Sequence, residues 1–386
     1  MRNLCTAIII LVFCASTGCA NDSVGAGSAI TLDMEANTII SASKLWLVTE
    51  NGELVIRQPN WDPIARGYTE PTSIVVGGIS GIKALSSQSD YSDLVYVIKE
   101  DGTVWQAIET GSTSQYGFEK TPDISDCVKI CTGNGYAIAL TSDGSVYAWG
   151  DNKYGQLGLG TTRKSKTPKK VKALSNIIDI ACDIDHSMAL NDNGKVYTWG
   201  NNDQGQLGDG EFTKRSDYGM GPIIMKNNNR RSPYLLESLS GIIQIAAGSG
   251  HSFALRGDGV VFEWGTGDDL SIFLYLEPDF KMKTPYEVKG LEQIVEISAY
   301  GIHAIALSSS GDIWRWGNVL AVPGEGWDTI PKKTAVFPNP EKIVAGKIDA
   351  VITKDGEIWQ GFVEDEYYDG KAVRILSQED IQKISS

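Results

Sequence analysis

Apolar and polar residues alternate along most of this chain, and short turns interrupt the alternation at regular intervals. In residues 137–149, AIALTSDGSVYAW, apolar alternation lies on both sides of a Ser-Asp-Gly turn, which is a pattern that predicts a β-hairpin. Similar turns recur with an average spacing of about 51 residues, and their glycines are Gly52, Gly102, Gly144, Gly194, Gly259, Gly311 and Gly356. We therefore expect seven copies of one β unit.

Aromatic residues occupy fixed places after these turns. Three positions after the glycine, six copies carry Trp105, Tyr147, Tyr197, Phe262, Trp314 and Trp359. Two positions further on, four copies carry Trp149, Trp199, Trp264 and Trp316. Since residues two apart lie on one face of a strand, both aromatics should fill the wedge between neighbouring sheets. An all-β unit repeated seven times predicts a seven-bladed β-propeller.

A longer segment is repeated with most of its residues unchanged. VYAWGDNKYGQLGLG, residues 146–160, returns as VYTWGNNDQGQLGDG, residues 196–210. A phosphate-binding loop is excluded because Gln156 and Leu157 stand where Lys and Ser or Thr are required. A calcium loop in the second copy is excluded because Gln206 replaces the glycine at its sixth place. The glycines are instead expected to permit positive φ and close strand approach after each hairpin.

One segment in the fifth copy carries a family resemblance. IAAGSGHSFAL, residues 245–255, is similar to the repeat of the regulator of chromosome condensation (RCC) family, and weaker versions begin at Ile130, Ile180, Ile297 and Ile343. The resemblance covers roughly residues 30–380 and implies a seven-bladed propeller. It also implies a possible activity, because the nuclear member of the family promotes nucleotide exchange on a small GTPase.

The three histidines, His186, His251 and His303, each lie eight residues before a turn glycine. Equivalent positions on separate blades are spread around a ring, and Tyr136 fills the fourth related place, so a structural hydrogen bond to a neighbouring backbone loop is expected and a metal site is not. Each histidine that precedes a serine cannot pair with it, because adjacent strand residues point to opposite faces. We predict no catalytic residue, cofactor or metal.

The first residues resemble an export signal. Arg2 and the apolar run from Leu4 to Ala15 predict a signal peptide over residues 1–18. Small residues before Cys19 resemble the bacterial lipoprotein signal and predict a lipid on Cys19, although Ser16 stands where a branched aliphatic residue is usual. Cleavage after Ala20 and free secretion is the alternative. Residues 19–28 are then a linker, and residues 29–386 form the propeller of an exported protein, lipid-anchored to a bacterial membrane or secreted.

Three cysteines remain inside the repeats. Cys127, Cys131 and Cys182 align with small or apolar core positions of other copies. Free buried thiols are the expectation, and a Cys131–Cys182 bridge between adjacent blades is the one disulfide that the alignment allows.

Charge narrows the choice of partners. The net charge of −14 argues against nucleic acid and anionic membrane surfaces. The least repetitive segment, residues 211–236, is predicted to be an insertion and is locally basic, with Lys214, Arg215, Lys226, Arg230 and Arg231. It is either a solvated surface insertion or a contact loop for an acidic partner.

These features favour a non-enzymatic, exported, monomeric propeller that binds a protein partner. Three alternatives remain. The first is regulation of a small GTPase by nucleotide exchange. The second is inhibition of a cell-wall or β-lactamase-type enzyme, since a secreted bacterial propeller of this fold inhibits β-lactamase. The third is glycan or cell-wall binding. The propeller fold alone does not choose among them.

Overall fold

A computed structural model describes most of the predicted propeller. The described residues are 36–40, 45–49, 54–62, 67–88, 94–110, 116–211, 214–216, 223–226, 228–265, 283–317, 328–334, 337–345, 350–355, 357–360, 364–365, 368–369 and 373–376. The predicted signal peptide, Cys19 and the linker lie outside them. Within these ranges no helix is long and apolar enough to cross a membrane.

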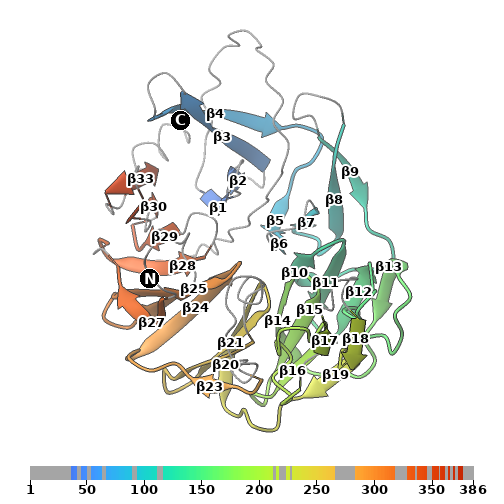
Figure 1. The fold of residues 1–386 in the computed structure, drawn as a ribbon. Helices are drawn as coiled ribbons and strands as arrows, with labels where there is room; N and C mark the ends of the chain where they lie inside the picture. Colours follow the sequence, from blue (N-terminus) through green and yellow to red (C-terminus); the bar gives the residue numbers. More distant parts are fainter. Residues whose placement is uncertain are drawn as a thin grey trace, which may run out of the picture.

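Seven sheets of four antiparallel strands follow one another along the described chain, and Figure 1 shows them arranged around a ring. Blade 1 contains β1 (Ala36–Ile40), β2 (Leu45–Thr49), β3 (Leu54–Asp62) and β4 (Gly67–Val76). Blade 2 contains β5 (Ile82–Leu85), β7 (Val95–Lys99), β8 (Val104–Glu109) and β9 (Tyr116–Lys120). Blade 3 contains β10 (Cys127–Gly133), β11 (Tyr136–Thr141), β12 (Val146–Gly150) and β13 (Ser165–Lys170).

The remaining blades repeat this order. Blade 4 contains β14 (Ile177–Asp183), β15 (His186–Asn191), β16 (Val196–Gly200) and β19 (Arg230–Leu235). Blade 5 contains β20 (Ile242–Gly248), β21 (His251–Arg256), β22 (Val261–Gly265) and β23 (Tyr286–Glu287). Blade 6 contains β24 (Ile294–Tyr300), β25 (His303–Ser308), β26 (Ile313–Gly317) and β27 (Asp328–Lys333). Blade 7 contains β28 (Pro340–Val344), β29 (Ala350–Thr353), β30 (Ile358–Gln360) and β33 (Val373–Leu376). The predicted seven-bladed propeller is confirmed.

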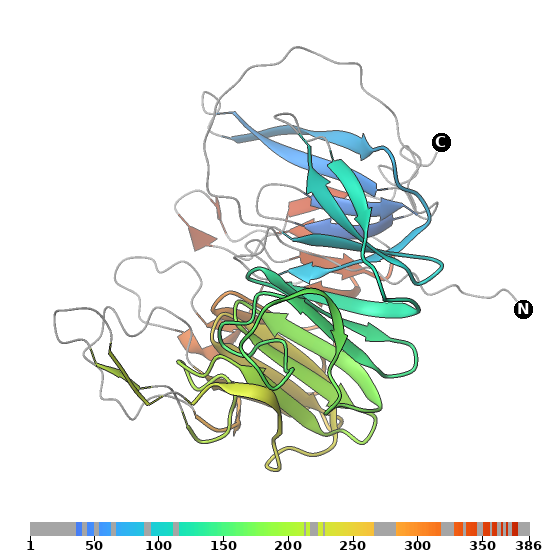
Figure 2. The same ribbon diagram turned by 90° about the vertical axis from the view of Figure 1, so that its right-hand side faces the viewer.

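Five short strands lie outside this scheme. β6 (Ser87–Gln88) joins blade 3 as a parallel neighbour of β10. β17 (Lys214–Ser216) and β18 (Ile223–Lys226) form a ribbon that projects beyond the sheets at the left of Figure 2. β31 (Glu364–Asp365) pairs with β32 (Tyr368–Asp369). The segment predicted as an insertion, 211–236, is therefore too long, because its last part is β19, the outer strand of blade 4.

The innermost strand of each blade begins in the same way in blades 2 to 7. The residue just before the strand has a positive φ, at Gly81, Asp126, Asn176, Gly241, Gln293 and Asn339. Glycine, asparagine and aspartate adopt this conformation most readily. The ladder then shifts by one residue near the start of the strand, as between Ile177 and Asp179. Such a bulge leaves one residue unpaired and turns its side chain away from the ladder.

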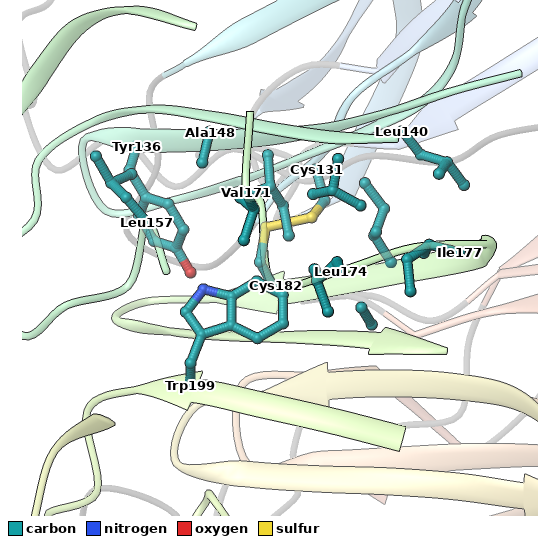
Figure 3. Packing of buried hydrophobic residues seen from close by; sticks show 14 residues of the cluster. Cys131, Tyr136, Leu140, Ala148, Leu157, Val171, Leu174, Ile177, Cys182 and Trp199 are labelled. Carbon is teal, nitrogen blue, oxygen red and sulfur yellow. A yellow bond between two sulfur atoms is a disulfide. The ribbon is translucent and has the colours of Figure 1, made fainter. Parts of the chain in front are cut away.

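The predicted wedge aromatics fill the space between blades. Trp199 and Trp264 are fully buried, and Trp316 is nearly so. Figure 3 shows Trp199 of β16 pointing toward Leu157 and Val171 of blade 3. Each tryptophan thus belongs to the core between its own blade and the preceding one. Burying a side chain of this size stabilises the fold by a few kcal/mol.

One sequence expectation about the links between blades needs correction. Cys131 of β10 and Cys182 of β14 form a disulfide, with their Cα atoms 6.0 Å apart, so free thiols were wrong for this pair and right only for buried Cys127. The alignment placed both at small or apolar core positions, one residue apart in the repeat, and the structure shows that the adjacent inner strands bring them together. At the other end of the described chain, Val373–Leu376 pairs with β30 of its own blade.

Candidate functional site

The two faces of the ring differ in their connections. The loop face carries the connections after the third strands, including residues 151–164 and 201–211. The turn face carries the Asp-Gly and Ser-Gly hairpin turns and the starts of the innermost strands. Backbone bonds show this arrangement, since Gly102 of a turn accepts from Cys127 at the start of β10.

On the loop face, the repeated Gly-Gln-Leu-Gly segment joins neighbouring blades. The carbonyl of Gln156 accepts hydrogen bonds from Trp199 Nε1 at 2.7 Å and Ser187 Oγ at 2.9 Å. Gly158 lies directly against this indole, because a Cβ there would be 2.9 Å from Trp199 Nε1. Only glycine combines this close approach with a φ of +69°.

The second copy makes the same joint with blade 5. Trp264 Nε1 and Ser252 Oγ donate to the carbonyl of Gln206 at 2.9 and 2.8 Å. A Cβ on Gly208 would lie 2.8 Å from the Trp264 indole. The repeated segment is therefore a joint between blades. The close approach at its glycines is the one that the sequence predicted.

The same connection in blade 3 also shapes a surface. Asn152 is buried, and its Nδ2 donates to the carbonyls of Thr161 and Arg163, both at 2.9 Å, while its Oδ1 accepts from Leu157 N at 3.0 Å. These three bonds fold the connection back on itself. Lys153, next in sequence, is exposed at its surface, beside half-buried Tyr154.

An outer groove of about 520 Å³ lies between this connection and β19 of blade 4. Its walls include Lys153, Tyr154, Thr162, Arg230, Arg231 and Tyr234. The walls touch at the base, where Gly160 N donates to the carbonyl of Arg231 at 2.8 Å. Gly155 approaches the same strand so closely that a Cβ would be 2.7 Å from the Arg231 Cα.

An inner groove of about 540 Å³ lies on the other side of the same connection. It shares Lys153, Tyr154 and Thr162 with the outer groove and adds Lys164, Asp151 and Asp185. The two grooves therefore flank one lysine and one tyrosine. They differ in charge, since the described residues that line the outer groove include cations and no carboxylate.

The cations of the outer groove are held to different degrees. Arg230 donates from Nε to Asp209 Oδ2 at 2.8 Å, and its guanidinium lies 4.0 Å from the centre of the Tyr234 ring. The Asp209 side chain is fully buried, so this arginine is fixed in place. Arg231 is exposed, and Lys153 Nζ lies 5.1 Å from the Tyr154 ring. Exposed cations beside a fixed one suit an anionic ligand.

Two residues of the predicted contact set are among the described residues that line this groove. Arg230 and Arg231 line it, whereas Lys214 and Lys226 face each other as backbone partners in the β17–β18 ribbon, with Arg215 following Lys214. The sequence interpretation missed Lys153 and Tyr154. A signal was present, because the second copy carries Asp203 and Gln204 at these places.

His186 is structural in a different way from the one expected. His186 Nε2 lies 3.0 Å from Ser252 Oγ of the next blade, so it bonds a side chain and not a backbone loop. Burial, together with the charge of His251, lowers the pKa of His186 to about 3. Tyr136 makes the contact expected of a histidine, since its hydroxyl lies 2.9 and 2.6 Å from the carbonyls of Asp183 and His186.

The His186–Ser252 pair has the spacing of a base and a nucleophile, and sequence reasoning missed it because the two residues are 66 positions apart. Ser252 is completely buried and donates to the carbonyl of Gln206. The pair therefore links blades 4 and 5 inside the core. His303 is also buried and packs edge-on against Tyr300, with ring centres 6.2 Å apart.

His251 belongs to a buried ionisable cluster. Its Nδ1 lies 3.0 Å from Glu263 Oε1, and Glu263 Oε2 accepts from Tyr286 Oη at 2.8 Å and Trp316 Nε1 at 3.0 Å. Burial raises the pKa of Glu263, but the hydrogen bond and charge of His251 and the other two donors outweigh it and hold this pKa below its usual value. Trp316 thus binds blade 5 through a carboxylate.

Comparison with known proteins places this arrangement in a family. A sequence model described as "RCC1-like domain" matches residues 95–362. Over 281 residues the chain is 32% identical to the mitochondrial RCC1 domain-containing protein RUG3 of Arabidopsis thaliana, covering 69% of this chain and 58% of that protein. It is 34% identical over 213 residues to the secretion-regulating guanine nucleotide exchange factor of Bos taurus, covering 50% of this chain and 41% of that protein.

The human E3 ubiquitin-protein ligase HERC2 is 34% identical over 229 residues, which cover 58% of this chain but 4% of the ligase. The chain thus spans less than two thirds of each of these relatives. Among solved structures, yeast RCC1 (Prp20) bound to Kap60 superposes with a TM-score of 0.62 at 17% identity, covering 95% of this chain and 91% of that one. This likeness concerns the fold.

Proposed function

The chain belongs to the RCC1-like domain family, and we propose that it is a protein-binding propeller whose outer groove holds an acidic segment of a partner. The observation that carries the proposal is the charge of this groove. Lys153, Arg230 and Arg231 line it, and its described lining has no carboxylate, on a chain with a net charge of −14. A cationic groove on an acidic protein attracts acidic segments selectively and repels basic ones.

Two further facts support binding over catalysis. The polar groups with catalytic spacing, His186 and Ser252, are buried between blades and bonded to their neighbours. A propeller of this fold, yeast RCC1, is known in a complex with the protein Kap60. Both facts favour a role in which surface loops bind a protein.

The test uses a fluorescent peptide of alternating glutamate and serine as the probe. Lys153→Glu and Arg231→Glu should each weaken its binding about tenfold at low salt, because a charge reversal replaces an attraction with a repulsion. Arg230 is not suited to this test, since reversing it would place a second carboxylate beside buried Asp209.

Lys172→Glu is the matched control. This lysine is exposed and follows β13 on the turn face, so its reversal changes the net charge equally without touching the groove. The proposal fails if Lys172→Glu weakens binding as much as Arg231→Glu, or if none of the variants differs from wild type.

Export is part of the same proposal. Disulfides form and persist in oxidising compartments, and the Cys131–Cys182 bridge suits such a compartment. We expect Cys19 to be the lipidated first residue of the mature protein. Mass spectrometry of the purified protein checks this, since an unmodified terminus at Asn21 would instead indicate free secretion.

Nucleotide exchange is the second candidate function, favoured by the similarity to the Bos taurus exchange factor. A direct test measures release of fluorescent GDP from small GTPases in the presence of this protein. If the Arg231→Glu variant still accelerates GDP release, the exchange activity belongs to a surface other than the outer groove.

A further inference from the structure

Four exposed aliphatic side chains lie at equivalent places in consecutive blades. Most large apolar side chains of the described residues are buried, but these four leave 40%, 54%, 54% and 51% of their surface exposed: Val128, Ile178, Ile243 and Val295. Each is the second residue of an innermost strand. We call this set the aliphatic arc.

The bulge at the start of the innermost strands explains why these side chains are exposed. The ladder skips Val128, Ile178, Ile243 and Val295, which have no partner on the neighbouring strand. Strands β10, β14, β20 and β24 contact one another in turn around the axis, as Figure 1 shows. The four side chains therefore follow a curve on the turn face.

The bulge itself does not require an apolar residue. Blades 2 and 7 have the same ladder shift, and there the skipped residues are the exposed Lys83 and Glu341. Four consecutive blades nevertheless carry valine or isoleucine. The fold thus tolerates a charged side chain at this position. A continuous row of aliphatic side chains there indicates a surface that a partner covers.

Acidic residues border the arc on the same face. The exposed carboxylates of Asp101, Asp126, Asp143 and Asp192 belong to the hairpin turns or to the residue before an innermost strand; we call these the acidic rim. The turn that holds Asp143 packs against the start of β14, since a Cβ on Gly144 would be 3.1 Å from the Asn176 Cα. Hydrogen bonds from Thr141 and Ser145 lower the pKa of Asp143, so it is ionised at neutral pH.

We propose that the aliphatic arc and the acidic rim bind a basic segment with apolar side chains, supplied by a second partner protein. A second copy of this chain fits less well, because two acidic rims would repel each other. Four half-exposed aliphatic side chains also offer much less than the roughly 800 Å² per partner of a stable protein interface. The arc lies on the turn face, so this site is independent of the outer groove and would make the propeller a bridge between two partners.

The probe for this site is a synthetic amphipathic peptide of leucine and lysine. Its first control replaces leucine with serine and keeps the charge, and its second replaces lysine with glutamate and keeps the apolar face. We expect binding of the leucine–lysine peptide alone. The double variant Ile178→Gln and Ile243→Gln should weaken it about tenfold, and Asp143→Asn with Asp192→Asn should weaken it and reduce its salt dependence.

Arg231→Glu is the control on the protein and should leave this binding unchanged, since it acts on the loop face. A melting curve tests whether the glutamine variant is folded. We expect this curve to match that of the wild type, because the fold tolerates Lys83 and Glu341 at the equivalent positions. The proposal is overturned if the leucine-to-serine peptide binds equally well, if the glutamine variant binds as wild type does, or if the leucine–lysine peptide does not bind. It is also overturned if sedimentation shows a dimer that the glutamine variant abolishes, because a second copy would then cover the arc.

Discussion

Two joints between blades use the same residue and different acceptors. In the Trp199 joint, between blades 3 and 4, the indole donates to the backbone carbonyl of Gln156. In the Trp316 joint, between blades 5 and 6, the indole donates to the carboxylate of Glu263, which His251 and Tyr286 also contact. Blade 5 lacks the Gly-Gln-Leu-Gly segment after its third strand, and a side chain takes over the role of the loop.

The difference shows how a repeat tolerates the loss of its motif. A backbone carbonyl is present whatever the side chain is, and it does not titrate, so the Trp199 joint needs only the loop conformation that its glycines allow. A buried carboxylate needs several donors to offset the cost of removing its charge from water. The Trp316 joint is therefore sensitive to single substitutions and to pH.

The largest expected effect is common to both joints. Trp199→Ala and Trp316→Ala should each lower the free energy of unfolding by about 3–5 kcal/mol, because each leaves a large cavity between blades. Denaturant titrations of both variants check this. A cost below that of an ordinary surface substitution in either one would show that its blade interface does not depend on the indole.

The second largest loss of stability should differ between the two joints. Glu263→Ala should cost about 3–5 kcal/mol, since it leaves His251, Tyr286 and Trp316 without their shared acceptor. Gln156→Ala should cost only about 1–2 kcal/mol, because the backbone carbonyl that accepts from Trp199 remains. Equal losses in the two variants would contradict the distinction between carbonyl and carboxylate joints.

The disulfide distinguishes the Trp199 joint in a further way. Cys131 and Cys182 are 51 residues apart, and replacing both by alanine should cost about 2–4 kcal/mol, as loss of a bridge closing a long loop does. Melting with and without reductant checks this, and reductant should have no effect on the alanine variant. If reductant does not change the melting temperature of the wild type, this prediction is wrong.

The smallest effect is the pH dependence of the Trp316 joint. The pKa of Glu263 in the folded protein is below its ordinary value, so the unfolded chain binds the proton first as the pH falls. Stability is then lost below about pH 4.5, with a slope of up to about 1.4 kcal/mol per pH unit. Glu263→Gln should remove this part of the slope.

His186 contributes a separate dependence of stability on pH, which is the same in the wild type and in the Glu263→Gln variant. Its folded pKa of about 3 lies below the ordinary value of 6.5, so stability also falls as the pH drops from 6.5 toward 3. The comparison of wild type with Glu263→Gln cancels this contribution. Identical acid unfolding curves would show that Glu263 does not titrate on unfolding.

The sequence alone determined the repeat, the hairpins, the seven blades and the buried tryptophans. These features depend on alternation and turn residues within a few positions, and a strand shows them wherever it is placed. The pattern at Val146–Gly160 identified a repeated structural unit because it recurs with its glycines intact. Two successive apolar residues also start the innermost strands of blades 3 to 6 in the sequence, but only the structure shows that the second of each pair is exposed.

Only the tertiary structure decided which groups meet across blades. Trp199 and Gln156 are 43 residues apart, and His186 and Ser252 are 66 apart, so their contact depends on the angle between sheets, which no local pattern specifies. The same holds for the outer groove, where Lys153 and Arg231 come from different blades. The cysteines show the limit most clearly, since alignment placed Cys131 and Cys182 only at small or apolar core positions of the repeat, and the packing of β10 against β14 brings them together as a disulfide.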